Sequence, residues 1–158
     1  PSRFPHIVDW KHSTPLHVYA TRAEGVDYSK VHLEGWRTQQ ELLLELSKGG
    51  GFGLVWGNSE NPAEERDYYK ENVSYKLTTY LAAGIPVVVP DYLSNVDYIR
   101  EKGLGFVVSS LEEASRVVQE CTAEEYDQMV TRAKYTAYLI KNGYFTKKLF
   151  IDSMMLLD

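Results

Sequence analysis

Short apolar runs alternate along the chain with segments whose apolar residues recur at helical spacing. Continuous runs at 52–56, 87–89 and 106–108 are typical of strands buried on both faces, and weaker patterns at 16–20 and 31–33 predict two further strands. Helical spacing places core residues in four further segments: Leu42, Leu43, Leu46; Val96, Ile99; Leu111, Ala114, Val117, Val118; and Met129, Val130, Ala133, Ala137, Ile140. We therefore expect an α/β domain, a Rossmann-like parallel sheet with helices on both faces.

Capping residues predict where several of these helices begin and end. Thr38 is a candidate N-cap, and Thr122 with Glu125 three residues later forms a capping box. Gly103 and the pair Asn142-Gly143 are expected stops. A last helix is predicted from about Thr146, with apolar residues along one side: Leu149, Phe150, Met154 and Leu157.

The stretch 72–90 predicts a helix, a glycine stop at Gly84 and a buried strand. Asn72 is the expected N-cap, and Val73, Leu77, Tyr80 and Leu81 are the expected core face. Lys76 and Thr79 then share a different face with Asn72. A helix N-terminus presents unpaired N–H groups, and a lysine one turn later adds a full positive charge. This combination favours binding of an anion, most simply a phosphate.

Composition and charge narrow the class of protein. The chain has 158 residues, 44% of them hydrophobic, which is enough for one domain with a core, and its net charge of -5 disfavours a nucleic-acid partner. A single cysteine, Cys121, excludes an internal disulfide and fits a reducing compartment, so we expect a cytoplasmic location. No apolar run is long enough to span a bilayer. We expect residues 1–15, which lack an initiator Met, to be a linker or lead-in cut from a longer chain, and 16–158 to be the domain.

Other polar residues give weaker indications. The four histidines lack a metal-ligand spacing, and His17 and His32 are expected to be strand residues satisfied by neighbours. No Asp-x-Asp motif occurs, so no metal site is predicted. The charged segment 57–71 is interpreted as a solvated loop, with a lid over a ligand as the alternative; its acidic residues are Glu60, Glu64, Glu65, Asp67 and Glu71.

Two motifs carry a family resemblance: Phe52-Gly53-Leu54-Val55-Trp56, and the segment from Lys76 through Gly84-Ile85-Pro86-Val87-Val88. From about Leu16 to its end, the chain resembles the C-terminal domain of a GT-B glycosyltransferase. More narrowly, it is similar to the glucosyltransferases that extend the glycan on serine-rich-repeat adhesins of Gram-positive bacteria.

The resemblance implies one half of a GT-B fold, in which this half binds a UDP-sugar without a metal or other cofactor. A missing N-terminal half would then bind the glycan acceptor and, if the reaction inverts the anomeric configuration, supply the general base. By position, the implied UDP-binding residues are Arg3, Gly35, Trp36, Asn72, Val73, Ser74, Tyr75, Lys76 and Thr79. Thr79 stands where many GT-B domains carry a ribose-binding glutamate. The apolar last helix favours a homo-oligomer.

Three alternatives stay open at this level. A UDP-sugar 2-epimerase of the same fold would keep the nucleotide site and place its own acids near the sugar. A non-catalytic nucleotide-binding module would keep the fold without a competent partner domain. A flavodoxin-like receiver is disfavoured because no acidic cluster follows the predicted strands.

Overall fold

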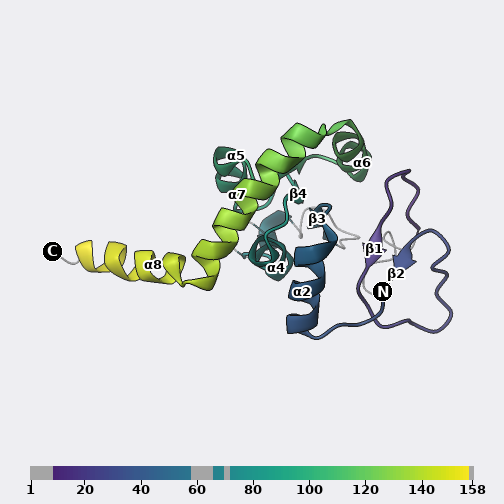
Figure 1. The fold of residues 1–158 in the computed structure, drawn as a ribbon, viewed down its shortest axis with the longest axis horizontal. Helices are drawn as coiled ribbons and strands as arrows, with labels where there is room; N and C mark the ends of the chain where they lie inside the picture. The colour runs from purple at the N-terminus through teal and green to yellow at the C-terminus, as the bar shows by residue number, and fades with distance from the viewer. Residues whose placement is uncertain (1–8, 58–65, 70–71, 157–158) are drawn as a thin grey trace.

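A computed structural model describes residues 9–57, 66–69 and 72–156, with strands and helices alternating along much of the chain (Figure 1). In chain order the elements are β1 (His17–Val18), β2 (His32–Leu33), α2 (Gln39–Gly49), β3 (Gly53–Leu54), α4 (Tyr75–Ala83), β4 (Val87–Pro90), α5 (Val96–Lys102), β5 (Gly105–Val108), α6 (Leu111–Glu120), α7 (Ala123–Lys141) and α8 (Tyr144–Met155). The predicted α/β class is confirmed.

The strands form two sheets where the sequence predicts one. Strands β1 and β2 pair in parallel, with His17 opposite His32, and β3, β4 and β5 form a separate parallel sheet in that order. Within the described residues, β1 and β3 are therefore each paired on one edge only. The predicted parallel pairing is confirmed, and the expected single sheet is split between β1 and β3.

Helices cover both faces of the three-stranded sheet, as predicted. Val87 and Val89 point to one face and pack with Leu77 of α4 and Ile99 of α5. Val88 points to the opposite face and packs against α6. Because successive strand residues alternate between faces, a continuous apolar run such as β4 requires a helical layer on each side.

Two glycines determine where α4 ends and how closely it packs on β3. Gly84 ends α4 in the left-handed conformation (φ 78°), as predicted, and its N–H donates to the carbonyl groups of Leu81 and Tyr80. Gly53 of β3 lies directly under the Tyr80 ring, which a Cβ at this position would overlap. The absence of a side chain at Gly53 thus allows α4 to pack onto β3.

The predicted helix caps are largely confirmed. Thr38 and Thr122 each form a reciprocal capping box, with Glu41 and Glu125 respectively. Gly103 ends α5 in the left-handed conformation. The α2 side chains predicted to be core, Leu42, Leu43 and Leu46, are only half-buried.

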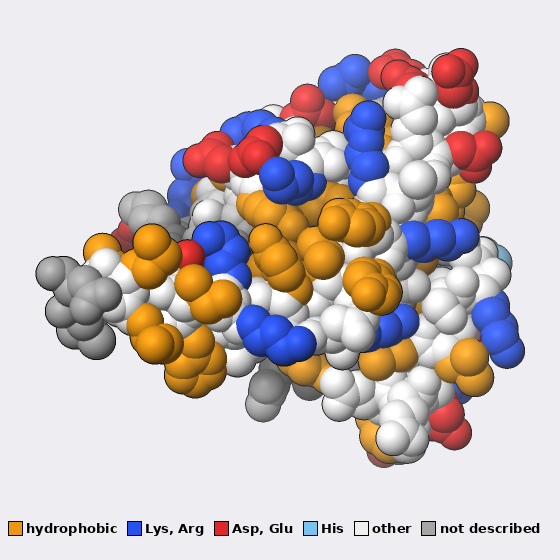
Figure 2. All heavy atoms as spheres, turned by 60° about the vertical axis from the view of Figure 1, so that its left-hand side comes forward, with side chains coloured by type: hydrophobic (Ala, Val, Ile, Leu, Met, Phe, Trp, Pro, Cys, Tyr) orange, Lys and Arg blue, Asp and Glu red, His pale blue; other side chains and the backbone are white. Residues whose placement is uncertain are grey.

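The C-terminal helix α8 begins at Tyr144, two residues before the predicted start, because Gly143 takes a left-handed conformation (φ 65°) and serves as its N-cap. In Figure 1, α8 extends away from the rest of the molecule beyond α7. Figure 2 shows apolar side chains along this projection. They include Leu149, Phe150, Ile151, Met154 and Met155, which are all exposed. No helix in the described ranges is long and apolar enough to cross a membrane.

Candidate functional site

The residues predicted to bind an anion lie around the start of α4, and this helix begins later than predicted. Its N-cap is Ser74, which is buried and makes no side-chain capping hydrogen bond. The prediction that Asn72 is the cap is wrong, because its amide Nδ2 donates to the Tyr68 carbonyl over 2.9 Å. Val73 consequently precedes the helix and is 61% exposed, so its assignment to the core face is also wrong.

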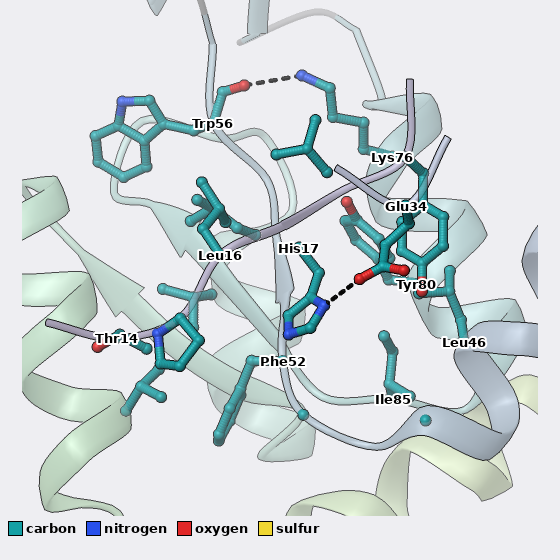
Figure 3. A pocket seen from close by; sticks show the side chains of 18 of the residues that line it. Thr14, Leu16, His17, Glu34, Leu46, Phe52, Trp56, Lys76, Tyr80 and Ile85 are labelled. Carbon is teal, nitrogen blue, oxygen red and sulfur yellow. Dashed lines mark hydrogen bonds and ion pairs between the residues drawn. The ribbon is translucent and has the colours of Figure 1, made fainter. Parts of the chain in front are cut away.

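Lys76 stands in the first turn of α4, as the proposed phosphate site requires. Its side chain is half-buried, and Nζ donates to the main-chain carbonyl of Trp56 over 2.8 Å (Figure 3). Trp56 lies two residues after β3, so this contact holds the ammonium near the carboxyl end of the strand. An ammonium has three N–H donors, and the backbone N–H groups of the first turn of α4 lie beside it. Ligands of open α/β sheets bind beyond this same edge.

Thr79 does not share an exposed face with Lys76, which corrects the predicted arrangement. Its side chain is buried, and its hydroxyl donates to the Tyr75 carbonyl one turn earlier over 3.0 Å. The hydroxyl at the position where many GT-B domains carry a ribose-binding glutamate therefore donates its proton to the helix backbone. Tyr75 itself is exposed, beside the N-cap.

The loop after β2 carries Gly35 and Trp36. Gly35 has a left-handed conformation (φ 84°), and Trp36 is 65% exposed, so it is not a core residue. The Trp36 carbonyl accepts from Arg37, whose Nε also pairs with Glu45 of α2 at 2.7 Å. An exposed indole presents a flat apolar face to solvent, which is the property needed to stack on a base. Arg3 and four of the five predicted acidic loop residues, all but Asp67, lie outside the described residues.

A cavity of about 840 Å³ separates β1 from β3 and reaches the Lys76 side chain (Figure 3). Apolar residues dominate its wall, among them Leu16, Leu46, Phe52, Ile85 and Val88. This cavity was not predicted from the sequence, because it lies between two sheets that were expected to be one. Glu34, which precedes Gly35, also lines the cavity, so the loop after β2 and the first turn of α4 border one space.

Polar groups meet at one part of this cavity. His17 Nδ1 donates to Glu34 Oε1 over 2.7 Å, and the His17 ring stacks on His32 with centroids 4.8 Å apart. The prediction that neighbours satisfy these histidines is confirmed for His17, whereas the contact of the His32 ring is stacking on His17. Burial raises the pKa of the Tyr19 phenol, and the carboxylates of Glu45 and Glu34 raise it further. Tyr19 therefore stays a protonated donor throughout the neutral range.

The described residues contain no group of three or more His, Cys, Asp or Glu side chains that could hold a metal ion. At the start of α4, the Lys76 ammonium and the first-turn N–H groups lie together and can meet an anionic ligand. These groups neutralise negative charge without a proton transfer.

Comparison with known proteins gives the family. A family model described as "Glucosyltransferase 3-like, C-terminal domain" matches residues 1–153. The chain belongs to this family. The resemblance predicted from the sequence motifs is thereby confirmed.

Named relatives of this Glucosyltransferase 3-like domain agree with the assignment. Glucosyltransferase 3 of Streptococcus gordonii is 56% identical over 153 residues, which are 97% of this chain and 46% of the relative. Glucosyltransferase 3 of Streptococcus parasanguinis is 35% identical over 154 residues, 98% of this chain and 45% of that protein. The Beta-1,6-galactofuranosyltransferase WbbI of Escherichia coli (strain K12) is 31% identical over 100 residues, 61% of this chain and 30% of that protein. The chain spans about half the length of the two streptococcal relatives.

Proposed function

We propose that this Glucosyltransferase 3-like domain is the donor-binding half of a GT-B glycosyltransferase, and that its donor is a UDP-sugar, with UDP-glucose the first candidate. The family match and the names of the three relatives, all glycosyltransferases, support glycosyl transfer over epimerisation. Glucose as the sugar is suggested by the name of the two streptococcal relatives.

One observation carries the proposal. The Lys76 ammonium lies in the first turn of α4 and is fixed at the carboxyl end of β3 by the Trp56 carbonyl. A positive side chain next to a helix N-terminus is suited to a diphosphate, since both contribute positive potential to the same place.

In the proposed reaction, an acceptor hydroxyl attacks the anomeric carbon of the sugar. The bond from that carbon to the diphosphate oxygen breaks, and UDP leaves with the bonding electron pair. Negative charge therefore grows on the diphosphate in the transition state. Lys76 and the α4 N-terminus would stabilise this charge, which is electrostatic catalysis at the leaving group. If the reaction inverts the anomeric configuration, the general base that takes the hydroxyl proton would come from the half of the enzyme that binds the acceptor.

The acceptor, the cellular location and self-association are also proposals. A glycan on a serine-rich-repeat protein is the acceptor suggested by the sequence resemblance. The cytoplasm is suggested by the single cysteine, Cys121, which is half-buried and has a pKa raised mainly by burial. Self-association is suggested by the exposed apolar side chains of α8.

A chimera tests the proposed activity. The chain would be joined to the half of the Streptococcus gordonii relative that it does not cover and incubated with UDP-[14C]glucose and a glycosylated serine-rich-repeat acceptor. We expect label on the acceptor and equimolar UDP. Conversion of the sugar nucleotide to an epimer would instead indicate the epimerase alternative. UDP-glucose that stays intact in the presence of acceptor, although the chimera is folded, would contradict the proposal and favour a binding module.

A further inference from the structure

The carboxyl end of β4 carries an acidic residue on the face of the sheet that α4 covers. The Asp91 N–H donates to the Val108 carbonyl over 2.9 Å, so the ladder between β4 and β5 continues to this residue. Because side chains alternate along a strand, Asp91 falls on the face of Val87 and Val89, which pack against α4 and α5. Asp91 is exposed, at the edge of the sheet where ligands of open α/β folds bind.

A short segment of the connection between β3 and α4, residues 66–69, is docked on the same edge. The Tyr69 carbonyl accepts from the Ser94 N–H over 3.0 Å, in the turn that follows β4. The Tyr68 carbonyl accepts from the N–H and the Nδ2 of Asn72, at 3.2 and 2.9 Å, just before α4 begins. Segment 66–69 therefore connects the end of β4 with the start of α4.

Arg66 brings a cation to the end of β4. Its guanidinium lies over the ring of Tyr92, 5.4 Å from the centroid, and Tyr92 directly follows Asp91 in the chain. Both Arg66 and Asp91 are exposed. Within residues 9–57, 66–69 and 72–156, neither their guanidinium nor their carboxylate makes a hydrogen bond or an ion pair. The N–H donors of Arg66 and the carboxylate oxygens of Asp91 are thus available to a ligand.

These two groups favour a neutral ligand that is rich in hydroxyl groups. A phosphate next to Asp91 would meet a charge of the same sign. A hydroxyl group both donates and accepts, so neighbouring hydroxyls can donate to the carboxylate of Asp91 and accept from the guanidinium of Arg66. A hexosyl group carries hydroxyls on adjacent carbons. The end of β4 therefore has the chemistry to bind a sugar, whereas the start of α4 has the chemistry to bind a diphosphate.

The order of the strands places the end of β4 where the sugar of the proposed donor would lie. Continuation of the register between β3 and β4 sets Trp56 level with Pro90, and Lys76 Nζ bonds to the Trp56 carbonyl. The end of β4 is thus one strand spacing, about 4.8 Å, from the strand end that holds Lys76. Trp36, the proposed base contact, follows β2, beyond the other edge of β3. A sugar nucleotide with its base near β2 and its diphosphate at β3 directs its sugar toward β4.

We propose that Asp91 and Arg66 bind the hexosyl group of the sugar nucleotide and determine which sugar is accepted. Asp91 accepts hydrogen bonds from sugar hydroxyl groups, and Arg66 donates to their oxygens. Neither residue takes part in the breaking of the glycosyl bond, so both contribute to the affinity for the sugar and to its orientation. This inference rests on the proposed UDP-sugar donor and adds the residues that select its sugar.

Titration calorimetry of the chain with UDP, UDP-glucose and UDP-galactose tests this inference. We expect Asp91→Ala and Arg66→Ala each to weaken UDP-glucose binding by about tenfold, the effect of one lost hydrogen bond to a charged group. The affinity of Asp91→Ala for UDP should not fall, because the variant loses a negative charge and UDP has no sugar. Wild type should distinguish glucose from galactose, which differ in one hydroxyl, and Asp91→Ala should do so less. Asp127→Ala, which removes an exposed carboxylate of α7, should leave all three affinities unchanged.

Three results would overturn the inference, and they have different meanings. Equal losses of UDP and UDP-glucose affinity would show that Asp91 and Arg66 act on the nucleotide or on the fold, and unchanged melting temperatures would exclude the fold. Unchanged UDP-glucose affinity in both variants, with weaker binding of a free acceptor glycan, would assign the end of β4 to the acceptor. Failure of the wild-type chain to bind UDP would contradict the proposed donor itself, and this inference with it.

Discussion

Replacement of Gly53 by alanine should destabilise the domain and weaken the candidate site together. The added Cβ would overlap the ring of Tyr80, which packs between α4 and β3. Relief requires either a shifted ring or a wider separation of α4 and β3. Overpacking of this kind typically costs about 1–3 kcal/mol of unfolding free energy. For a chain of this length we expect the melting temperature to fall by roughly 2–12 °C.

Thermal and urea unfolding of Gly53→Ala would be compared with Gly49→Ala. Gly49 lies at the end of α2, and a Cβ there meets nothing within 4 Å. We therefore expect this control to be neutral or to gain about 0.5–1 kcal/mol, since alanine favours a helix more than glycine does. Tyr80→Leu should recover part of the Gly53→Ala loss, because a smaller side chain leaves room for the Cβ. Wild-type stability of Gly53→Ala, or strict additivity in the double variant, would refute the close packing of α4 on β3.

Three further predictions concern a cap, assembly and base choice. Thr122→Ala should cost about 1 kcal/mol of unfolding free energy through the lost N-cap. Backbone and side-chain hydrogen bonds from Thr122 hold the pKa of Glu125 below its ordinary value. The stability that this carboxylate contributes is therefore present above the ordinary pKa and is lost as the pH falls through the lowered one. A difference in unfolding free energy between wild type and Thr122→Ala that does not shrink in acid would contradict this. Phe150→Glu should shift light scattering from an oligomer to a monomer, and a monomeric parent chain at high concentration would rule out assembly through α8. If Trp36 borders uracil, UDP at about a hundred times its dissociation constant should add roughly 2.7 kcal/mol to the free energy of unfolding. It should raise the melting temperature more than ADP or GDP does at the same concentration. Equal shifts would show that only the diphosphate is recognised.

Local sequence signals predicted the fold where one short segment contains all the determinants. Thr122 and Glu125 stand three residues apart and cap α7 without help from elsewhere. Gly84 follows α4 directly, and the run at 87–89 is apolar in every position, so each fixes its own element. These predictions needed no knowledge of distant neighbours.

Predictions failed where contacts with residues outside the segment decide. Asn72 and Ser74 are both good N-cap residues, and the helix begins after Ser74 while the Asn72 amide bonds to the Tyr68 carbonyl. The two-residue shift also moved Val73 out of the helical face. The Lys76 contact with the Trp56 carbonyl joins residues twenty positions apart. Every residue has a main-chain carbonyl, so the sequence does not show which one a side chain will contact. The cavity between β1 and β3 was equally invisible, since it depends on which strands pair.

The central claim is that Lys76 and the start of α4 bind a diphosphate, and titration calorimetry with UDP and with uridine tests it most directly. A hydrogen bond to a charged group contributes about 1.5–3 kcal/mol, so Lys76→Ala should weaken UDP binding roughly tenfold to a hundredfold. Lys76→Arg should recover only part of the lost affinity, because the planar guanidinium of arginine differs in shape from the compact ammonium of lysine. Lys147→Ala, which removes an exposed lysine on the projecting helix α8, should leave the UDP affinity unchanged. Uridine has no phosphate and should bind wild type and Lys76→Ala alike. Equal UDP affinity of wild type and Lys76→Ala would contradict the claim and move the phosphate site elsewhere.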